Sequence, residues 1–269
     1  MALLRQALFV WLVAAISLPT RADNVLFIGN SFTLGAGSPV LGKDGGLAAL
    51  FQAIARAKGR HVAASAVAVG GKDWSYHLAQ PATARALGSK TWTWVVLQDY
   101  STRPTHVGDV KQFMRDGETF SKRIARTSPA AGILLFETWA RPPGAFYNGK
   151  PGHDFSGHGQ MTSELHQSYG RLRDDLAGKN SHRPVRVALV GTAFASAAAQ
   201  FPAINLDCPD HHHASAEGSY LAVLVIYETI YHDSAKGAPT RFFRGALVIP
   251  ADDAAKLQEV ADEIGGGVK

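Results

Sequence analysis

The chain has 269 residues, of which 46% are hydrophobic and 18% charged, a globular composition with enough apolar residues for one large core or two small ones. Lys and Arg number 27 against 22 Asp and Glu, a formal net charge of +5, and the basic residues are scattered without interleaved aromatics, which argues against a nucleic-acid groove. The single cysteine, Cys208, excludes an internal disulfide framework and any multi-cysteine zinc or iron–sulfur site.

The chain begins with a pattern that is typical of an export signal. Arg5 is followed by a strongly apolar stretch, residues 7–18, which is too short for a comfortable membrane span. Small residues follow at Thr20 and Ala22, so we predict that residues 1–22 are a signal peptide cut after Ala22, with an uncleaved anchor helix as the alternative. We expect one domain over residues 23–269, exported to a periplasm or secreted, without stable membrane insertion after cleavage.

Short apolar runs then alternate with helical patterns. Strands are expected at residues 24–28, 62–69, 94–97, 132–136 and 185–190, with an extended piece at 247–249. Helices are expected around residues 47–54, 110–124, 165–176, 215–231 and 257–264, with Ser215 as the cap of the fourth. Strands that are apolar on both faces and alternate with helices predict an α/β domain with a parallel sheet covered on both sides.

One long stretch, residues 141–159, is rich in glycine and proline and has no periodic pattern. Loops of this length in compact domains are usually functional or mobile. A disordered surface insertion is an equally good interpretation, so we assign no chemistry to this segment.

Polar residues gather where the expected strands end. They are Gly29-Asn30-Ser31, Gly70-Gly71-Lys72-Asp73-Trp74, Gln98-Asp99-Tyr100-Ser101, Glu137-Thr138-Trp139 and the run from Asp207 to Ser215. Ligands of an open parallel sheet bind beyond the carboxyl ends of its strands, so these residues are expected to share one site. Together they supply the parts of a serine acyl-transfer site: a hydroxyl nucleophile, backbone N–H donors on flexible glycines, a side-chain amide and an acid–imidazole pair.

Two of these blocks resemble a known superfamily. Gly29-Asn30-Ser31 resembles the Gly-Asp-Ser block of the SGNH, or GDSL-type, hydrolases, and Asp210-x-x-His213-x-Ser215-x-x-Gly218-x-Tyr220-Leu221 resembles their final block. The resemblance implies a three-layer α/β/α sandwich with a mostly parallel five-stranded sheet in flavodoxin-like order. It also implies hydrolysis of esters, often acyl groups on carbohydrates or lipids, without a cofactor or a metal.

The sequence departs from the superfamily pattern in two places. Asn30 stands where the first block has an aspartate, and the third block, usually Gly-x-Asn-Asp, is replaced by Leu97-Gln98-Asp99-Tyr100-Ser101. The missing asparagine normally helps to hold the oxyanion. The amide of Gln98 also carries donors and is our expected substitute.

The proposed triad is Ser31, His213 and Asp210. Ser31 would be the nucleophile, although a serine that only caps the next turn is the structural alternative. His213 would take its proton and later protonate the leaving alcohol, and Asp210 would fix the tautomer of that imidazole. The spacing to the following Ser-x-x-Gly-x-Tyr pattern selects His213 over the two histidines before it, and Asp207 is the competing acid.

Further residues are expected to complete the site. The oxyanion would be held by the backbone N–H groups of Ser31 and Gly71 together with Gln98. We expect Trp74, Tyr100 and Trp139, which follow strands, to line the substrate pocket, where their rings could stack on a sugar. The alternative is that each ring is partly buried and packs a helix onto the sheet.

We therefore expect an exported serine esterase acting on a small-molecule or carbohydrate ester, with short acyl groups on carbohydrate as the first candidates. A catalytically silent, carbohydrate-binding relative is the main alternative, because of Asn30 and the altered third block. A metal-dependent hydrolase using His211, His212 and His213 is less favoured, because adjacent residues of an extended chain point to opposite faces.

Overall fold

The computed structural model describes residues 22–141, 144–147, 150–152, 155–179 and 182–265. The expected signal peptide therefore lies outside the described residues except for Ala22. Within the described ranges, no helix has the length and apolar character needed to cross a membrane.

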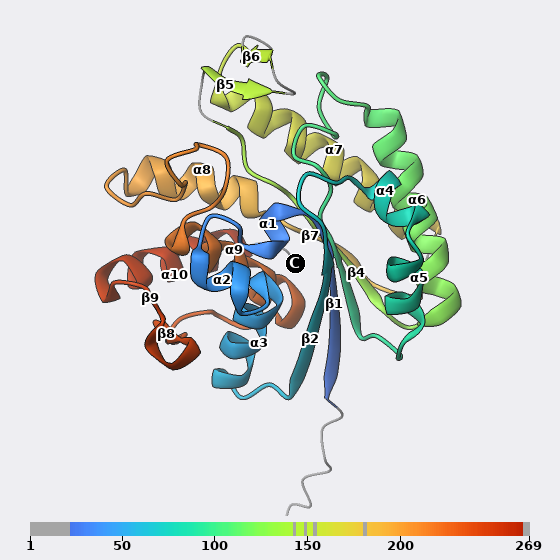
Figure 1. Ribbon diagram of the computed structural model, residues 1–269, viewed down its shortest axis with the longest axis horizontal. Coiled ribbons are helices and arrows are strands. Elements are labelled where there is room, and N and C mark those ends of the chain that lie inside the picture. The colour runs from blue at the N-terminus through green and yellow to red at the C-terminus, as the bar shows by residue number, and fades with distance from the viewer. Residues whose placement is uncertain (1–21, 142–143, 148–149, 153–154, 180–181, 266–269) are drawn as a thin grey trace, which may run out of the picture.

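A five-stranded parallel sheet forms the centre of the molecule (Figure 1). Its order is β2-β1-β3-β4-β7, which is the flavodoxin-like order, and the prediction of an α/β fold is confirmed. The strands are β1 (Asp23–Gly29), β2 (Val62–Ala68), β3 (Trp94–Leu97), β4 (Gly132–Phe136) and β7 (Val185–Ala188).

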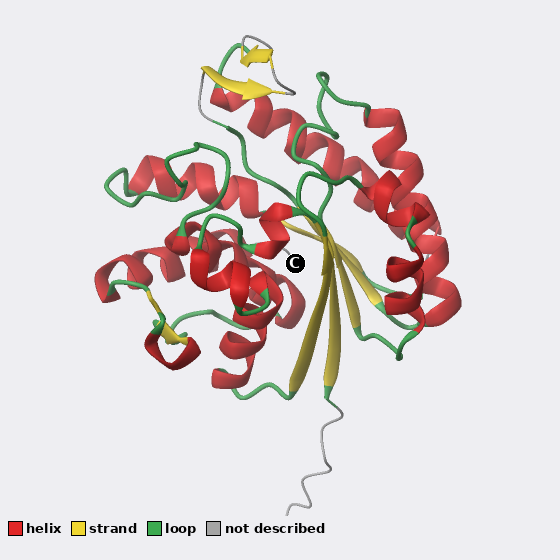
Figure 2. Cartoon of the chain, in the orientation of Figure 1, coloured by secondary structure: helices red, strands yellow, loops and turns green. Residues whose placement is uncertain are grey.

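Alternation along β1 divides the core into two layers. Val25 and Phe27 enter the larger apolar cluster, whereas Leu26 and Ile28 enter the cluster on the opposite face. Helices cover both faces (Figure 2). The larger cluster lies against α1 (Ser31–Leu34), α2 (Pro39–Lys43), α3 (Gly46–Ala57), α8 (Val190–Gln200), α9 (Ala216–Tyr231) and α10 (Ala251–Gly265). The other cluster lies against α4 (Trp74–Ala79), α5 (Pro81–Gly88), α6 (Val110–Thr127) and α7 (His158–Lys179).

The apolar run after Ser215 forms α9, which is buried along almost its whole length. A helix that is apolar all round belongs in the interior, and α9 packs between α3, α8 and α10. The Ser215 side chain accepts a hydrogen bond from Gly218 N at 3.0 Å, so the predicted cap is present.

The segment expected to be irregular contains regular structure. β5 (Gly144–Tyr147) and β6 (Lys150–Gly152) pair as an antiparallel hairpin, and α7 begins at His158. The extended piece near residue 248 is β9 (Leu247–Val248), which pairs with β8 (Arg241–Phe242), and η1 (Phe243–Gly245) joins the two.

Candidate active site

Ser31 is the first residue of the short helix α1, directly after β1. Asn30 caps this helix: its side-chain oxygen accepts from Phe32 N at 3.2 Å, and its side-chain nitrogen donates to Lys72 O at 3.1 Å. Asn30 is only 3% exposed. Its amide therefore ties the turn that carries Ser31 to the loop after β2, a link that needs both a donor and an acceptor and that an ionised aspartate would not make.

Gln98 lies beneath this turn. Its side-chain oxygen accepts from Asn30 N and from the Thr33 hydroxyl, both at 2.9 Å, and its side-chain nitrogen donates to Asp99 O. A Cβ at Gly29 would lie 2.5 Å from that Gln98 oxygen, so the turn and the amide fit closely only because residue 29 is glycine. Gln98 is 1% exposed. In this geometry Gln98 holds the turn in place through these hydrogen bonds. Its side-chain nitrogen is bonded to Asp99 O, so it does not donate to an oxyanion as the sequence predicted.

Asp210 and His213 form a close pair. His213 Nδ1 lies 2.6 Å from Asp210 Oδ2, while Asp210 Oδ1 accepts from the backbone amides of His212 at 2.9 Å and His213 at 3.0 Å. Partial burial would raise the pKa of Asp210, but these hydrogen bonds outweigh it and lower the pKa to about 2. The carboxylate is therefore ionised at neutral pH and holds Nδ1 as the donor, which leaves Nε2 of His213 free to act as a base.

This acid–imidazole loop docks on the turn that begins at Ser31. The ring of Phe32 faces His213 edge-on, with 5.8 Å between ring centroids and an interplanar angle of 83°. The thiol of Cys208 donates to Gly37 O at 3.1 Å. A Cβ at Gly37 would lie 2.1 Å from Ala214 O, so the two backbones approach as closely as they do because residue 37 has no side chain. Residues 171 positions apart in the sequence are thus in contact at one site.

The loop itself is closed by backbone pairing. Cys208 N donates to His213 O, Asp207 and Ala214 form an isolated antiparallel bridge, and Ser215 N donates to Leu206 O. A Cβ at Gly218 would lie 2.1 Å from Leu206 O. The glycine of the Ser-x-x-Gly pattern therefore lets the start of α9 pass under the loop that presents Asp210 and His213.

The three consecutive histidines do not converge on one point. His212 packs on Phe32 at 4.9 Å between centroids, and burial together with nearby Arg141 lowers its pKa to about 4. His213 pairs with Asp210, and His211 takes a left-handed backbone conformation with φ of 52°. In the part of the chain that the structure describes, no three His, Cys, Asp or Glu residues are grouped as a metal site.

Asp207, the competing acid, lies in a different environment. Burial raises its pKa to about 6, and among the described residues its Oδ1 has no hydrogen-bond partner. Among the described residues no hydrogen bond joins it to His213, whereas Asp210 makes three hydrogen bonds to the 212–213 segment. The geometry favours Asp210 as the partner of the imidazole.

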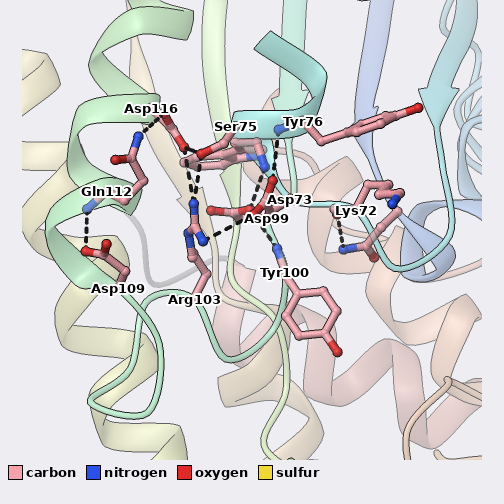
Figure 3. A network of polar contacts seen from close by, with 12 residues as sticks. Lys72, Asp73, Ser75, Tyr76, Asp99, Tyr100, Arg103, Asp109, Gln112 and Asp116 are labelled. Atoms are coloured by element: carbon pink, nitrogen blue, oxygen red, sulfur yellow. Dashed lines mark hydrogen bonds and ion pairs between the residues drawn. The ribbon is translucent and has the colours of Figure 1, made fainter. Parts of the chain in front are cut away.

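Gly71 lies in the loop after β2, three residues beyond the last strand residue, Ala68. Its φ is +70°, a conformation open to glycine, and the next residue, Lys72, accepts the hydrogen bond from Asn30. Gly71 borders a cavity of about 340 Å³ whose other walls come from the loops after β2 and β3. Figure 3 shows the polar network on these loops, with Arg103 between Asp73 and Asp116.

Comparison with solved structures identifies the architecture. A protein from Slackia heliotrinireducens described as a candidate SGNH hydrolase superposes with a TM-score of 0.58 at 21% identity, covering 78% of this chain and 99% of that one. A DUF4886 family protein from Bacteroides uniformis gives 0.67 at 16% identity, covering 90% and 94%, and an acetyl xylan esterase gives 0.54 at 17% identity, covering 77% and 99%. The chain has the SGNH-hydrolase fold. No family model matches the sequence. No curated protein matches it either.

Within this SGNH fold two of the expected wall residues lie in the core. Trp74 is fully buried and stacks on Phe113 at 5.0 Å between centroids. Trp139 is 2% exposed and lies between Phe32 at 4.2 Å and Phe194 at 4.5 Å. Neither ring can contact a substrate from there, so the expected wall role is wrong for both, and each instead packs the sheet against a helix layer.

Tyr100 is the expected wall residue that does reach a cavity. It is partly exposed and borders the same 340 Å³ cavity as Gly71. Figure 3 shows its ring directed away from the carboxylate network that surrounds its backbone.

Sequence reasoning missed two residues that hold the SGNH turn in place. His77 is 1% exposed, and its Nε2 lies 2.7 Å from Gly29 O. Burial lowers its pKa, so the ring is neutral and its N–H donates to that carbonyl. Phe32 links the turn to both His212 and His213. The position of Phe32 directly after the candidate nucleophile was a usable signal, whereas nothing in the sequence around His77 pointed to Gly29.

Proposed function

We propose that this protein is an exported serine esterase of SGNH type that cleaves a carboxylic ester through an acyl-enzyme. The observation that supports this most directly is the Asp210–His213 pair, with 2.6 Å between Oδ2 and Nδ1, docked against the turn that starts with Ser31. A hydroxyl nucleophile is weak at neutral pH and gains its reactivity from such a base.

In the proposed reaction the Ser31 hydroxyl attacks the ester carbonyl while Nε2 of His213 takes its proton. Asp210 stabilises the imidazolium that forms and keeps it oriented. His213 then donates the proton to the departing alcohol, and an acyl group remains on Ser31. A water molecule, deprotonated by the same imidazole, releases the acid and restores the hydroxyl.

The oxyanion of each tetrahedral intermediate needs donors that are already in position. We assign the backbone N–H groups of Ser31 and Gly71 to this role, because Ser31 is the first residue of α1 and Gly71 lies in the loop that follows the neighbouring strand β2. Gln98 contributes by holding Asn30 N and the Thr33 hydroxyl, which fixes the position of the Ser31 backbone.

The proposed substrate is a short acyl group on a carbohydrate or another small alcohol. One similar structure is described as an acetyl xylan esterase, which makes acetylated sugars a reasonable first set to test. Export is proposed from residues 1–22, and sequencing of the mature N-terminus should give Asp23 first.

Hydrolysis of p-nitrophenyl esters from acetate to decanoate tests the activity and the acyl size together. We expect turnover that is highest for acetate or propionate and is lost in Ser31→Ala and His213→Ala with unchanged thermal unfolding. Absence of turnover by the unmodified protein on every ester would overturn the proposal.

A further inference from the structure

Trp139 contacts both halves of the proposed catalytic pair from within the core. It lies in the loop after β4 and is 2% exposed. Its indole stacks on Phe32, the residue directly after Ser31, with 4.2 Å between ring centroids and an interplanar angle of 14°. Its Nε1 donates to the backbone oxygen of His212, the residue directly before His213, at 3.3 Å. A single side chain therefore links the turn that carries the nucleophile to the loop that carries the base.

The ring of Trp139 is confined by further aromatic side chains. Phe194 of α8 stacks on it with 4.5 Å between centroids and an interplanar angle of 9°, and Phe136, the last residue of β4, lies at 6.5 Å. A ring packed in this way has no room to turn, so the direction of the indole N–H is fixed. The stacks need only a flat ring of this size, whereas the hydrogen bond to the loop needs the N–H itself.

The peptide unit between His212 and His213 is held at both of its polar ends. Its N–H, on His213, donates to Asp210 Oδ1 at 3.0 Å, and its C=O, on His212, accepts from Trp139 Nε1. The N–H and C=O of a trans peptide point in opposite directions, so Asp210 and Trp139 hold this plane from opposite sides. The imidazole of His213 extends from the end of the same plane, and its Nδ1 lies 2.6 Å from Asp210 Oδ2.

We propose that Trp139 is a positioning residue of the esterase, whose indole N–H holds the 212–213 peptide so that Nε2 of His213 can reach the Ser31 hydroxyl. The inference rests on the proposed esterase function. Trp139 acts through His213 and, at 2% exposed, does not touch the substrate. Loss of its N–H should therefore lower kcat and leave KM nearly unchanged, because the base is displaced while substrate binding is not.

Replacement of Trp139 by 3-benzothienylalanine removes the N–H and keeps a bicyclic ring of the same shape in both stacks. The hydrogen bond is at the long end of the range for N–H···O, so we expect a moderate effect. For p-nitrophenyl acetate, kcat should fall by about fivefold and KM should change by less than about twofold. Trp139→Phe also leaves a void beside Phe32 and Phe194, so its kcat should fall further, by about 20-fold.

Trp92 in the other helix layer provides the matched control. It is 3% exposed, and its Nε1 also donates to backbone oxygens, those of Ala86 at 3.1 Å and Leu87 at 3.2 Å. Trp92→Phe therefore removes the same atoms as Trp139→Phe and the same kind of hydrogen bond. Its melting temperature should fall as well, because a buried ring is lost, but its kcat should change by less than about twofold.

The hydrogen bond can also be observed at a single carbonyl carbon. Of the 11 histidines only residues 211–213 are adjacent, so protein labelled with ¹³C-carbonyl, ¹⁵N-histidine gives NMR correlations between a histidine carbonyl and the next histidine amide only for 211–212 and 212–213. Loss of the donor should move the His212 carbonyl signal upfield in the benzothienyl variant and leave it in place in Trp92→Phe. A role of Trp139 in core packing alone would not move this signal.

The outcomes separate the two proposals. Turnover by the unmodified protein with equal kcat in the benzothienyl variant and in Trp92→Phe would overturn the positioning role and leave the esterase standing. A His212 carbonyl signal that does not move in the benzothienyl variant would do the same. Failure of the unmodified protein to hydrolyse any p-nitrophenyl ester from acetate to decanoate would overturn the esterase and the positioning role with it.

Discussion

The ring of Phe32 stands edge-on to the imidazole of His213, with 5.8 Å between the ring centroids. Phe32 follows Ser31 directly, so the residue beside the proposed nucleophile contacts the proposed base. The relative position of nucleophile and base therefore depends on how the loop of residues 207–214 docks on the turn after β1, and a small displacement of either is expected to reduce catalysis strongly.

Gly37→Ala should displace that loop. The added Cβ would lie 2.1 Å from Ala214 O and 2.5 Å from the Cys208 sulfur, so the two backbones have to separate. We expect kcat for an ester to fall by about 100-fold, in line with the cost of misplacing a catalytic group by roughly 1 Å.

The control for this variant is Gly42→Ala in α2, where a Cβ meets nothing within 4 Å. Its kcat should be unchanged, and helix propensity should increase stability by about 0.5–1 kcal/mol. Equal kcat values for Gly37→Ala and Gly42→Ala would show that loop docking does not position the base.

Replacing each candidate acid by asparagine tests which of the two supports His213. Asp210→Asn removes the charge that supports the imidazolium and should lower kcat by about 100- to 10,000-fold. Asp207→Asn should change kcat by less than about threefold, because in the described structure the imidazole of His213 is hydrogen-bonded to Asp210 and not to Asp207. Initial rates on one ester decide between them, and a large loss in Asp207→Asn alone would reassign the acid.

Asp99 makes stability depend on pH. Burial raises its pKa to about 7, against the opposing effect of hydrogen bonds from Trp74 N and Tyr100 N, both 2.8 Å from Oδ1. In the unfolded chain this carboxyl ionises near pH 4. Between about pH 4 and pH 7 the folded state therefore binds more protons than the unfolded state, so this group makes the protein less stable as the pH rises.

Asp99→Asn should consequently stabilise the protein at pH 8 and have little effect at pH 4. Asparagine retains the acceptor oxygen for both backbone amides, and the gain at pH 8 is at most about 4 kcal/mol from the size of the shift. Thermal unfolding of both proteins at the two pH values measures it. The same difference in melting temperature at pH 4 and pH 8 would show that Asp99 ionises normally.

The five sheet strands and the helices α3, α6, α7, α9 and α10 were predictable from local pattern. The apolar runs at residues 94–97 and 132–136 are β3 and β4 without a shift, and Ser215 caps α9. These elements are long or strongly apolar, so their sequence decides their structure without help from distant contacts. The helices α1 and α4 span four and six residues, which is too short for a periodic pattern, and they were missed, as were α2 and α5. The eleven-residue α8 was missed too, because its first residue, Val190, continues the apolar run of β7 and was expected to be strand.

The roles of side chains at the strand ends were less predictable. Trp74 and Trp139 follow strands just as Tyr100 does, yet the first two are buried and the third is not. Their exposure depends on rings from α6 and α8, Phe113 and Phe194, whose positions only the tertiary structure fixes. Gln98 was expected to donate to the oxyanion, whereas its side-chain oxygen accepts hydrogen bonds from Asn30 N and the Thr33 hydroxyl on either side of Ser31.

Labelling with a fluorophosphonate tests the central claim most directly, because such a probe reacts with a serine hydroxyl only where a base activates it. The account predicts a stoichiometric adduct that peptide mass spectrometry locates on Ser31 and that is absent in Ser31→Ala and His213→Ala. An adduct on a different serine, or no adduct on a folded protein that hydrolyses esters, would contradict it.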